Sequence, residues 1–276
     1  MAKTNKEKIE IELDNKEKAL AQAPVIVSAS RSTDVPAFYC DWFFHRLKVG
    51  YSAWTNPFNG VKMYVSYAKT RFIVFWSKNP RPLLNHIDEV KARGIGCYVQ
   101  YSLNDYEEEK LERGVPPLAE RIETFKKLVD VLGKGSVIWR FDPLVLTEDI
   151  TIEKLLNKIE NIGDQLKGYT EKLVFSFVDI LSYNKVKNNL KANGISFVDW
   201  TEEQMAEFAS RLVALNKEKG WNYKLATCGE KGRYPGVEPN HCIDDELIIK
   251  KSFHDKELMN YLKAEIKPIP PRDMFT

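Results

Sequence analysis

Six short apolar runs, separated by longer amphipathic stretches, are the feature that most limits how this chain can fold. The runs are rich in β-branched and aromatic residues and are apolar throughout, which is typical of parallel strands buried on both faces. They cover Val25–Ala29, Phe72–Trp76, Cys97–Tyr101, Ser136–Phe141, Lys172–Val178 and Tyr223–Thr227. We expect each run to form one strand of a parallel sheet.

The stretches between these runs carry apolar residues at helical spacing. They cover Pro36–Val49, Pro116–Leu132, Ile152–Leu166 and Glu202–Lys219. Strands that alternate with helices in this way predict an α/β fold, a TIM-like (β/α) barrel, complete or partial, that forms one domain over residues 24–276. A doubly wound open sheet is the alternative, but the turn ASRSTD after the first run lacks the glycines of a dinucleotide-binding motif.

The first 23 residues form a separate arm. Apolar and charged residues alternate around Ile9, Ile11 and Leu13, and Asp14-Asn15 follows as a turn, which predicts a β-hairpin. This arm lacks the apolar core of a signal peptide, and no stretch has the ~20 apolar residues that cross a bilayer, so we expect a cytoplasmic protein with no membrane partner.

Composition narrows the function classes. The 276 residues include 41 Lys and Arg against 39 Asp and Glu, and 43% are hydrophobic. These proportions are ordinary for a globular enzyme and argue against a general nucleic-acid or membrane-surface binder. A small-molecule substrate is therefore the first expectation. A Lys-rich stretch from Lys185 to Lys191 leaves nucleic acid as a weaker alternative partner, although a solvated helix face explains it as well.

Polar residues follow the predicted strands, where barrel enzymes place their active sites. The residues expected in catalysis are Lys78, Arg140, Asp142, Asp179 and Glu230, and those expected to bind a cofactor are Arg31, Asp34, Asn56, Gln100 and Ser176. The two cations suit a ligand carboxylate or phosphate. We expect residues from four or more strands to point into one cavity of several hundred Å³, about the size of a cofactor-sized ligand.

Structural readings compete with some of these assignments. Asp34 has the character of a helix cap, and Arg140 with Asp142 has the spacing of an ion pair on one face of a strand. The tryptophans at 42, 54, 76 and 139 are expected in the core.

The four cysteines, Cys40, Cys97, Cys228 and Cys242, contain no CxxC pair and imply neither a disulfide scaffold nor a zinc ribbon. Cys228, His241 and Cys242, with Glu230, are a weak alternative metal site, because their spacing matches no standard ligand pattern. A Cys228 nucleophile with His241 as its base is a further alternative, without a recognised motif to support it.

Several motifs occur together in register with a known family. They read VIVSASRSTDVPAFYCDWFFHRL, TNPFNG, FIVFWSKNP, VPPLAERIETFKKL, VIWRFDPLVL, YTEKLVFSFVD and HCIDDELI. From about residue 24 to residue 249 the chain resembles the bacterial family catalogued as domain of unknown function 1848.

That resemblance implies a relationship to radical S-adenosylmethionine enzymes, since the family usually carries a C-x3-C-x2-C cluster motif like theirs. In such enzymes three thiolates hold a [4Fe–4S] cluster that works with S-adenosylmethionine. The four cysteines of this sequence do not have that spacing. The leading expectation is thus a radical-S-adenosylmethionine-like barrel enzyme without its cluster segment, and the rival is a cluster-free hydrolase or lyase that uses acid–base residues or a divalent metal.

Overall fold

The computed structural model describes residues 7–30, 33–56, 59–178, 187–188, 192, 194, 196–228 and 234–265. The chain divides into two compact units. The first comprises Met1–Tyr98 and Asp245–Pro268, and the second comprises Val99–Asp244 and Ile269–Thr276.

Seven strands form a parallel sheet in the order β11-β10-β9-β8-β7-β6-β3. Their bounds are β3 Ile26–Ala29, β6 Phe72–Ser77, β7 Gly96–Ser102, β8 Val137–Leu144, β9 Lys172–Phe177, β10 Lys224–Thr227 and β11 Glu238–Pro239. All six predicted strands and the α/β fold are confirmed, while closure of the sheet into a barrel stays a prediction. Strand β11 was not predicted, because a strand of two residues has no periodicity to detect.

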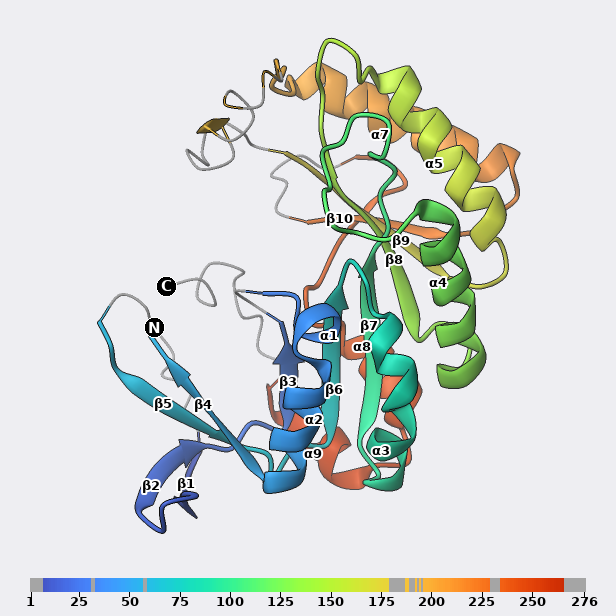
Figure 1. Cartoon of the computed structure of the whole chain (residues 1–276). Helices are drawn as coiled ribbons and strands as arrows, with labels where there is room; N and C mark the ends of the chain where they lie inside the picture. Colours follow the sequence, from blue (N-terminus) through green and yellow to red (C-terminus); the bar gives the residue numbers. More distant parts are fainter. Residues whose placement is uncertain are drawn as a thin grey trace. The chain divides into compact units, whose positions relative to one another are not determined.

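Three helices of the second unit lie side by side along the strands of that unit. They are α4 (Leu118–Leu132), α5 (Ile152–Leu166) and α7 (Glu202–Glu218) (Figure 1). Side chains of Thr151 and Thr201 cap the N-termini of α5 and α7. The helices pack on aromatic side chains of the strands. Tyr101 of β7 stacks on Phe125 of α4, with ring centroids 5.6 Å apart. Phe175 of β9 meets the edge of Phe208 of α7 at 5.8 Å.

The first unit adds a four-stranded sheet in the order β1-β2-β5-β4 (Figure 1). Its strands are β1 Lys8–Glu12, β2 Lys18–Gln22, β4 Tyr51–Thr55 and β5 Lys62–Ser66. The antiparallel β1–β2 hairpin confirms the predicted arm, whereas the β4–β5 hairpin was missed. The missed hairpin interrupts the strand–helix alternation on which the barrel prediction was built.

The helices of the first unit are short. They are α1 (Val35–Phe38), α2 (Cys40–Val49), the 3-10 helix η1 (Arg81–Asn85), α3 (Ile87–Ala92), α8 (Asp245–Ser252) and α9 (Lys256–Glu265). The predicted single helix over Pro36–Val49 is divided at Tyr39, whose backbone dihedrals are not helical. Within the described residues no helix is both long and apolar enough to cross a bilayer.

The prediction that four tryptophans lie in the core holds fully for one of them. Trp139 of β8 is completely buried, and its indole Nε1 donates to the carbonyl of Leu103 at 2.9 Å. Trp42 and Trp54 are instead 46% and 43% exposed. Both lie in the elements that differ from the prediction, on helix α2 and strand β4.

Candidate functional site

The register of the parallel strands separates the sheet of the second unit into two faces. Tyr101 lies beside Trp139, and Phe141 lies beside Phe175, on the face that packs against α4 and α7. Side chains alternate along a strand, so the residues between these aromatics point away from the helices. Arg140 occupies that opposite face.

Seven polar side chains gather on this opposite face and at the carboxyl ends of its strands, and we name them the strand-end cluster. They come from five consecutive strands or from the residues directly after them. The members are Gln100, Arg140, Asp142, Ser176, Cys228, Asn240 and Cys242. Because the strands are parallel, their carboxyl ends meet at one edge, which is where α/β proteins bind ligands.

Arg140 lies at the centre of the strand-end cluster and is only 4% exposed. Its Nε donates to Asp142 Oδ2 at 3.1 Å, and its Nη2 contacts the same oxygen. Nη1 donates to Gln100 Oε1 at 3.3 Å, and Nη2 also reaches Cys228 Sγ at 3.5 Å. Burial alone would lower the pKa of Arg140, but the negative charges of Asp142 and Cys228 raise it. The guanidinium therefore stays charged and is shared between a carboxylate and a sulfur atom.

Asp142 is fixed on both sides. Its Oδ1 accepts a hydrogen bond from the Ser176 hydroxyl, while Oδ2 binds Arg140. Its backbone N–H donates to Asn104 Oδ1 at 2.8 Å, and Asn104 Nδ2 donates back to the Asp142 carbonyl at 3.1 Å. The side chain of Asp142 is 26% exposed. A carboxylate is thus presented at the accessible edge of the cluster in one defined orientation.

Cys228 follows β10 and is partly exposed. Its sulfur accepts hydrogen bonds from the Cys242 thiol and from Asn240 Nδ2, the latter at 2.9 Å. The hydrogen bond from Cys242 is the largest influence on Cys228, and with the charge of Arg140 it lowers the pKa of Cys228 to about 6 against the effect of burial. The same hydrogen bond, together with burial, raises the pKa of Cys242. These surroundings favour the thiolate form of Cys228 and the protonated form of Cys242.

Two buried polar atoms of the strand-end cluster have no hydrogen-bond partner among the described residues. They are Gln100 Nε2, a donor, and Asn240 Oδ1, an acceptor. Such atoms are uncommon in folded proteins and each calls for an explanation, for example a bound polar molecule. Gln100 touches Arg140, and Asn240 touches Cys228, so both atoms lie next to the charged centre of the cluster.

The structure brings together four of the residues that the sequence predicts for the site. They are Gln100, Arg140, Asp142 and Ser176. Cys228 and Cys242 were named only as a weak alternative, and Asn240 was missed. The missed residue follows β11, the strand that the sequence pattern does not reveal.

The predicted site residues of the first unit have different surroundings. Asp34 caps α1 through Ala37 N at 3.0 Å, and its Oδ2 accepts from Ser77 Oγ at 3.0 Å and from the backbone N–H of Lys78 at 2.7 Å. Both oxygens are thus used to join the β3–α1 turn to the end of β6. Asn56 was expected to follow a parallel strand. It lies instead in the β4–β5 hairpin turn, where its backbone N–H donates to the Val61 carbonyl and its carbonyl accepts from the backbone N–H of Gly60.

Other predicted residues lie outside the described residues, namely Arg31, Asp179, Glu230 and most of the Lys-rich stretch from Lys185 to Lys191. His241 is described, but no group of three or more His, Cys, Asp or Glu side chains in the described part of the chain is placed to hold a metal ion. The one cavity of the second unit that we describe, about 340 Å³, is lined by other residues. These are Leu146, Thr147, Ile150, Thr151, Ile152, Glu153, Val198 and Gln204.

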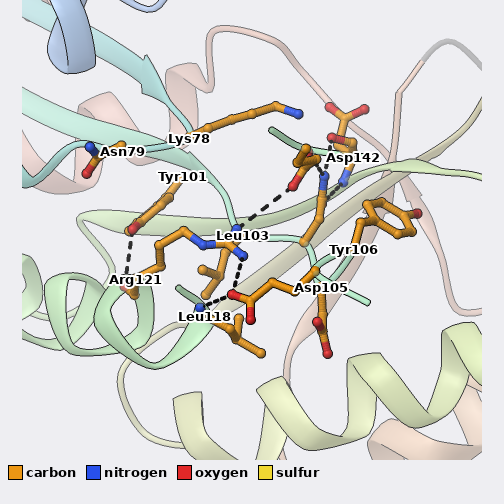
Figure 2. Close-up of polar contacts among 12 residues, drawn as sticks. Lys78, Asn79, Tyr101, Leu103, Asp105, Tyr106, Leu118, Arg121 and Asp142 are labelled. Carbon is orange, nitrogen blue, oxygen red and sulfur yellow. Dashed lines mark hydrogen bonds and ion pairs between the residues drawn. The ribbon is translucent and has the colours of Figure 1, made fainter. Parts of the chain in front are cut away.

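A second set of charged side chains joins the acidic loop after β7 to helices α4 and α5. Arg121 of α4 is 1% exposed and lies 3.7 Å from Glu107 and 3.9 Å from Glu112, while Tyr101 Oη donates to its backbone carbonyl at 3.1 Å (Figure 2). Lys158 of α5 lies 3.3 Å from Glu109. These pairs attach the acidic loop after β7 to α4 and α5.

Comparison with known proteins finds one match, which is to a family model. No curated protein and no solved structure shows significant similarity to this chain. The family model described as Domain of unknown function (DUF1848) matches residues 26–267, which include every member of the strand-end cluster. The chain therefore belongs to the DUF1848 family.

Proposed function

We propose that this chain is an enzyme whose active site is the strand-end cluster and whose nucleophile is the Cys228 thiolate. One observation carries the proposal: a buried guanidinium, Arg140, is shared between the Asp142 carboxylate and Cys228 Sγ on the sheet face away from the helices. A thiolate beside a cation is the usual arrangement of a reactive cysteine. The proposal takes the sheet to be part of a (β/α) barrel, complete or partial, as the sequence predicts.

The residues of the strand-end cluster divide the chemical work. Cys228 attacks an electrophilic carbon of the substrate, forming a carbon–sulfur bond while the leaving group departs with its bonding electrons. Arg140 and Asn240 stabilise the thiolate before attack. Water then attacks the same carbon, the carbon–sulfur bond breaks, and the Cys228 thiolate leaves with the bonding electrons. Asp142, held by Arg140 and Ser176, orients a polar group of the substrate or this water. Gln100 Nε2 and Asn240 Oδ1 supply an unused donor and acceptor for the same ligand.

The iron–sulfur chemistry implied by the resemblance remains a prediction. A [4Fe–4S] site of the radical type needs three thiolates. In the part of the chain that the structure describes, two cysteines meet in the strand-end cluster, while Cys40 and Cys97 lie in the first unit. No three cysteine side chains among the described residues are therefore placed to hold a [4Fe–4S] cluster, and we derive no step through such a cluster. S-adenosylmethionine stays a candidate ligand of the same strand ends.

An ester with a chromogenic leaving group tests the proposed nucleophile. We expect p-nitrophenyl acetate to give a burst of p-nitrophenolate of one equivalent per chain, with the acetyl group on Cys228 found by peptide mass spectrometry. Cys228→Ser should abolish the burst. The matched control is Cys97→Ala, which should leave the burst unchanged because desolvation raises the pKa of the Cys97 thiol to about 12. A folded wild-type protein without a burst, or a burst that survives Cys228→Ser, contradicts the proposal.

A further inference from the structure

Cys228 and Cys242 are brought together by the pairing of β10 with β11. Ala226 lies beside Glu238 and Thr227 beside Pro239 in a parallel register, and the backbone N–H of Asn240 continues the ladder to the carbonyl of Thr227 at 2.8 Å. Cys228 is therefore adjacent to Asn240, whose side chain it contacts. Cys242 follows two residues later, and its thiol donates to Cys228 Sγ.

The two sulfur atoms differ in their chemistry. Arg140 Nη2 at 3.5 Å and Asn240 Nδ2 at 2.9 Å both contact Cys228 Sγ and favour its thiolate, whereas the surroundings of Cys242, which include Cys228, favour its protonated thiol. Both side chains are partly exposed, so a small reagent can reach them. This is the arrangement of an attacking and a resolving cysteine in thiol–disulfide exchange.

We propose that Cys228 and Cys242 form a redox-active pair that reduces low-molecular-weight disulfides and is itself converted to an internal disulfide. The inference rests on the same Cys228 thiolate as the proposed function, and it adds a substrate class and a second reacting residue, Cys242.

The exchange balances in two steps. The Cys228 thiolate attacks one sulfur of a disulfide R–S–S–R, the S–S bond breaks, and one RS⁻ leaves with the bonding electrons. Cys242 then gives its proton to the departing RS⁻ and attacks Cys228 Sγ, releasing the second RS⁻, which takes a proton from solvent. One external disulfide is reduced to two thiols, and the two protein thiols are oxidised to one disulfide.

The surroundings favour this reaction over metal binding at the same sulfur atoms. Arg140 places a positive charge 3.5 Å from Cys228 Sγ, which opposes a cation at that position. No third side chain among the described His, Cys, Asp and Glu residues is placed to complete a metal site.

Oxidised glutathione is the probe for the experiment. Anaerobically reduced wild-type protein should lose two hydrogens on incubation with it, release two equivalents of glutathione, and yield one linked peptide pair that contains Cys228 and Cys242. Cys242→Ser should stop at a mixed disulfide between Cys228 and glutathione, and Cys228→Ser should not react. The matched control, Cys40→Ala, removes a cysteine of the first unit and should behave as wild type.

Two results would overturn the inference: a wild-type protein that stops at the mixed disulfide, or a purified protein that holds a metal ion released only when Cys228 and Cys242 are modified. The wild-type readout does not depend on a variant that folds. The ester burst separates the two proposals. A burst without an internal disulfide removes only this inference, and an internal disulfide without a burst removes only the proposed attack of Cys228 on an electrophilic carbon.

Discussion

Arg140 has two anionic partners, and this sharing governs the chemistry of the strand-end cluster. Its planar guanidinium binds Asp142 through two nitrogen atoms and still reaches Cys228 Sγ. A buried charge of this kind is retained only where its partners compensate for the loss of hydration. The sequence placed Arg140 and Asp142 together by their spacing of two residues, but it could not show that a cysteine 88 residues later in the chain is the second partner.

The contribution of Arg140 to the thiolate is testable by substitution. We expect Arg140→Gln to raise the pKa of Cys228 by about one unit or more, because the substitution removes the positive charge beside the thiolate. Each pKa unit corresponds to ~1.4 kcal/mol of differential interaction between the two protonation states. Arg140→Lys keeps the charge and should give a smaller rise. The measurement is the ultraviolet absorbance of the thiolate as a function of pH. Arg211→Gln, which alters an exposed arginine paired with Glu153, is the control and should leave the pKa unchanged.

An unchanged titration in Arg140→Gln, with native circular dichroism, would show that the guanidinium does not stabilise the thiolate. The hydrogen bonds from Cys242 and Asn240 would then account for it alone.

Helix α5 depends on one close contact with the segment before β10. A Cβ atom added at Gly163 would lie 2.6 Å from Trp221 Cζ2, and Trp221 is 4% exposed and held by Asp164. We expect Gly163→Ala to destabilise the protein by about 1–3 kcal/mol through overpacking, although alanine favours a helix. Urea unfolding measures the change. Asn157→Ala, on the exposed side of α5, should be neutral or stabilising, and equal effects of the two substitutions would contradict this account.

The contact between α5 and the loop after β7 gives a pH-dependent prediction. Lys158 and Glu109 are 8% and 9% exposed at the side chain and lie 3.3 Å apart. Burial alone would raise the pKa of Glu109, but its bonds to Lys154 and Lys158 lower it below 4.5. Lys158→Met should therefore cost about 3 kcal/mol at neutral pH, because it leaves part of a buried charge without its partner.

This cost should shrink at low pH. Because the pKa of Glu109 is lower in the folded protein than in the unfolded chain, the ionised carboxylate stabilises the fold at pH values above its unfolded pKa. This stabilisation is lost as the pH falls through the folded pKa, which lies below 4.5. Urea midpoints of wild type and Lys158→Met should therefore converge in acid. Lys127→Met, which breaks an exposed pair with Glu123, is the control and should have little effect at any pH.

Most elements could be predicted because their patterns are long and regular. Ile152–Leu166 was predicted with the bounds that α5 has, and Lys172–Phe177 lies within a predicted run, since a buried strand or helix face repeats over several residues. The β4–β5 hairpin and the two-residue β11 could not be predicted. Trp54 lies opposite Met63 in that hairpin, and their pairing joins segments whose apolar residues are partly exposed.

At the scale of the whole chain, membership of the DUF1848 family was predicted from ordered motifs and is shown by the match over residues 26–267. The motifs could not define the site, because its members lie on separate strands and meet only through strand order and register. Asn240 and Cys242 are contributed through β11, the final strand at one edge of the sheet.

The radical reading of the family is testable on the whole chain. We expect anaerobic treatment with ferrous iron and sulfide to give no stoichiometric [4Fe–4S] absorbance on these 276 residues, since Cys228 and Cys242 provide two thiols of the three that such a site needs. A cluster that forms on wild type and is lost in Cys228→Ser would contradict a nucleophilic role and assign the strand-end cluster to iron–sulfur chemistry.

The chemistry proposed for the strand-end cluster requires Cys228 to be a thiolate near neutral pH, and the alkylation rate of this residue measures that. Iodoacetamide reacts with the thiolate form, so peptide mass spectrometry of briefly treated protein measures the thiolate fraction at each cysteine. We expect Cys228 to be modified first, with a rate that reaches half its maximum near pH 6, whereas Cys40 and Cys97 stay unmodified because burial raises the pKa of each to about 12. A Cys228 whose rate still rises steeply between pH 8 and pH 9, as for an ordinary thiol with a pKa of about 8.5, would contradict this expectation.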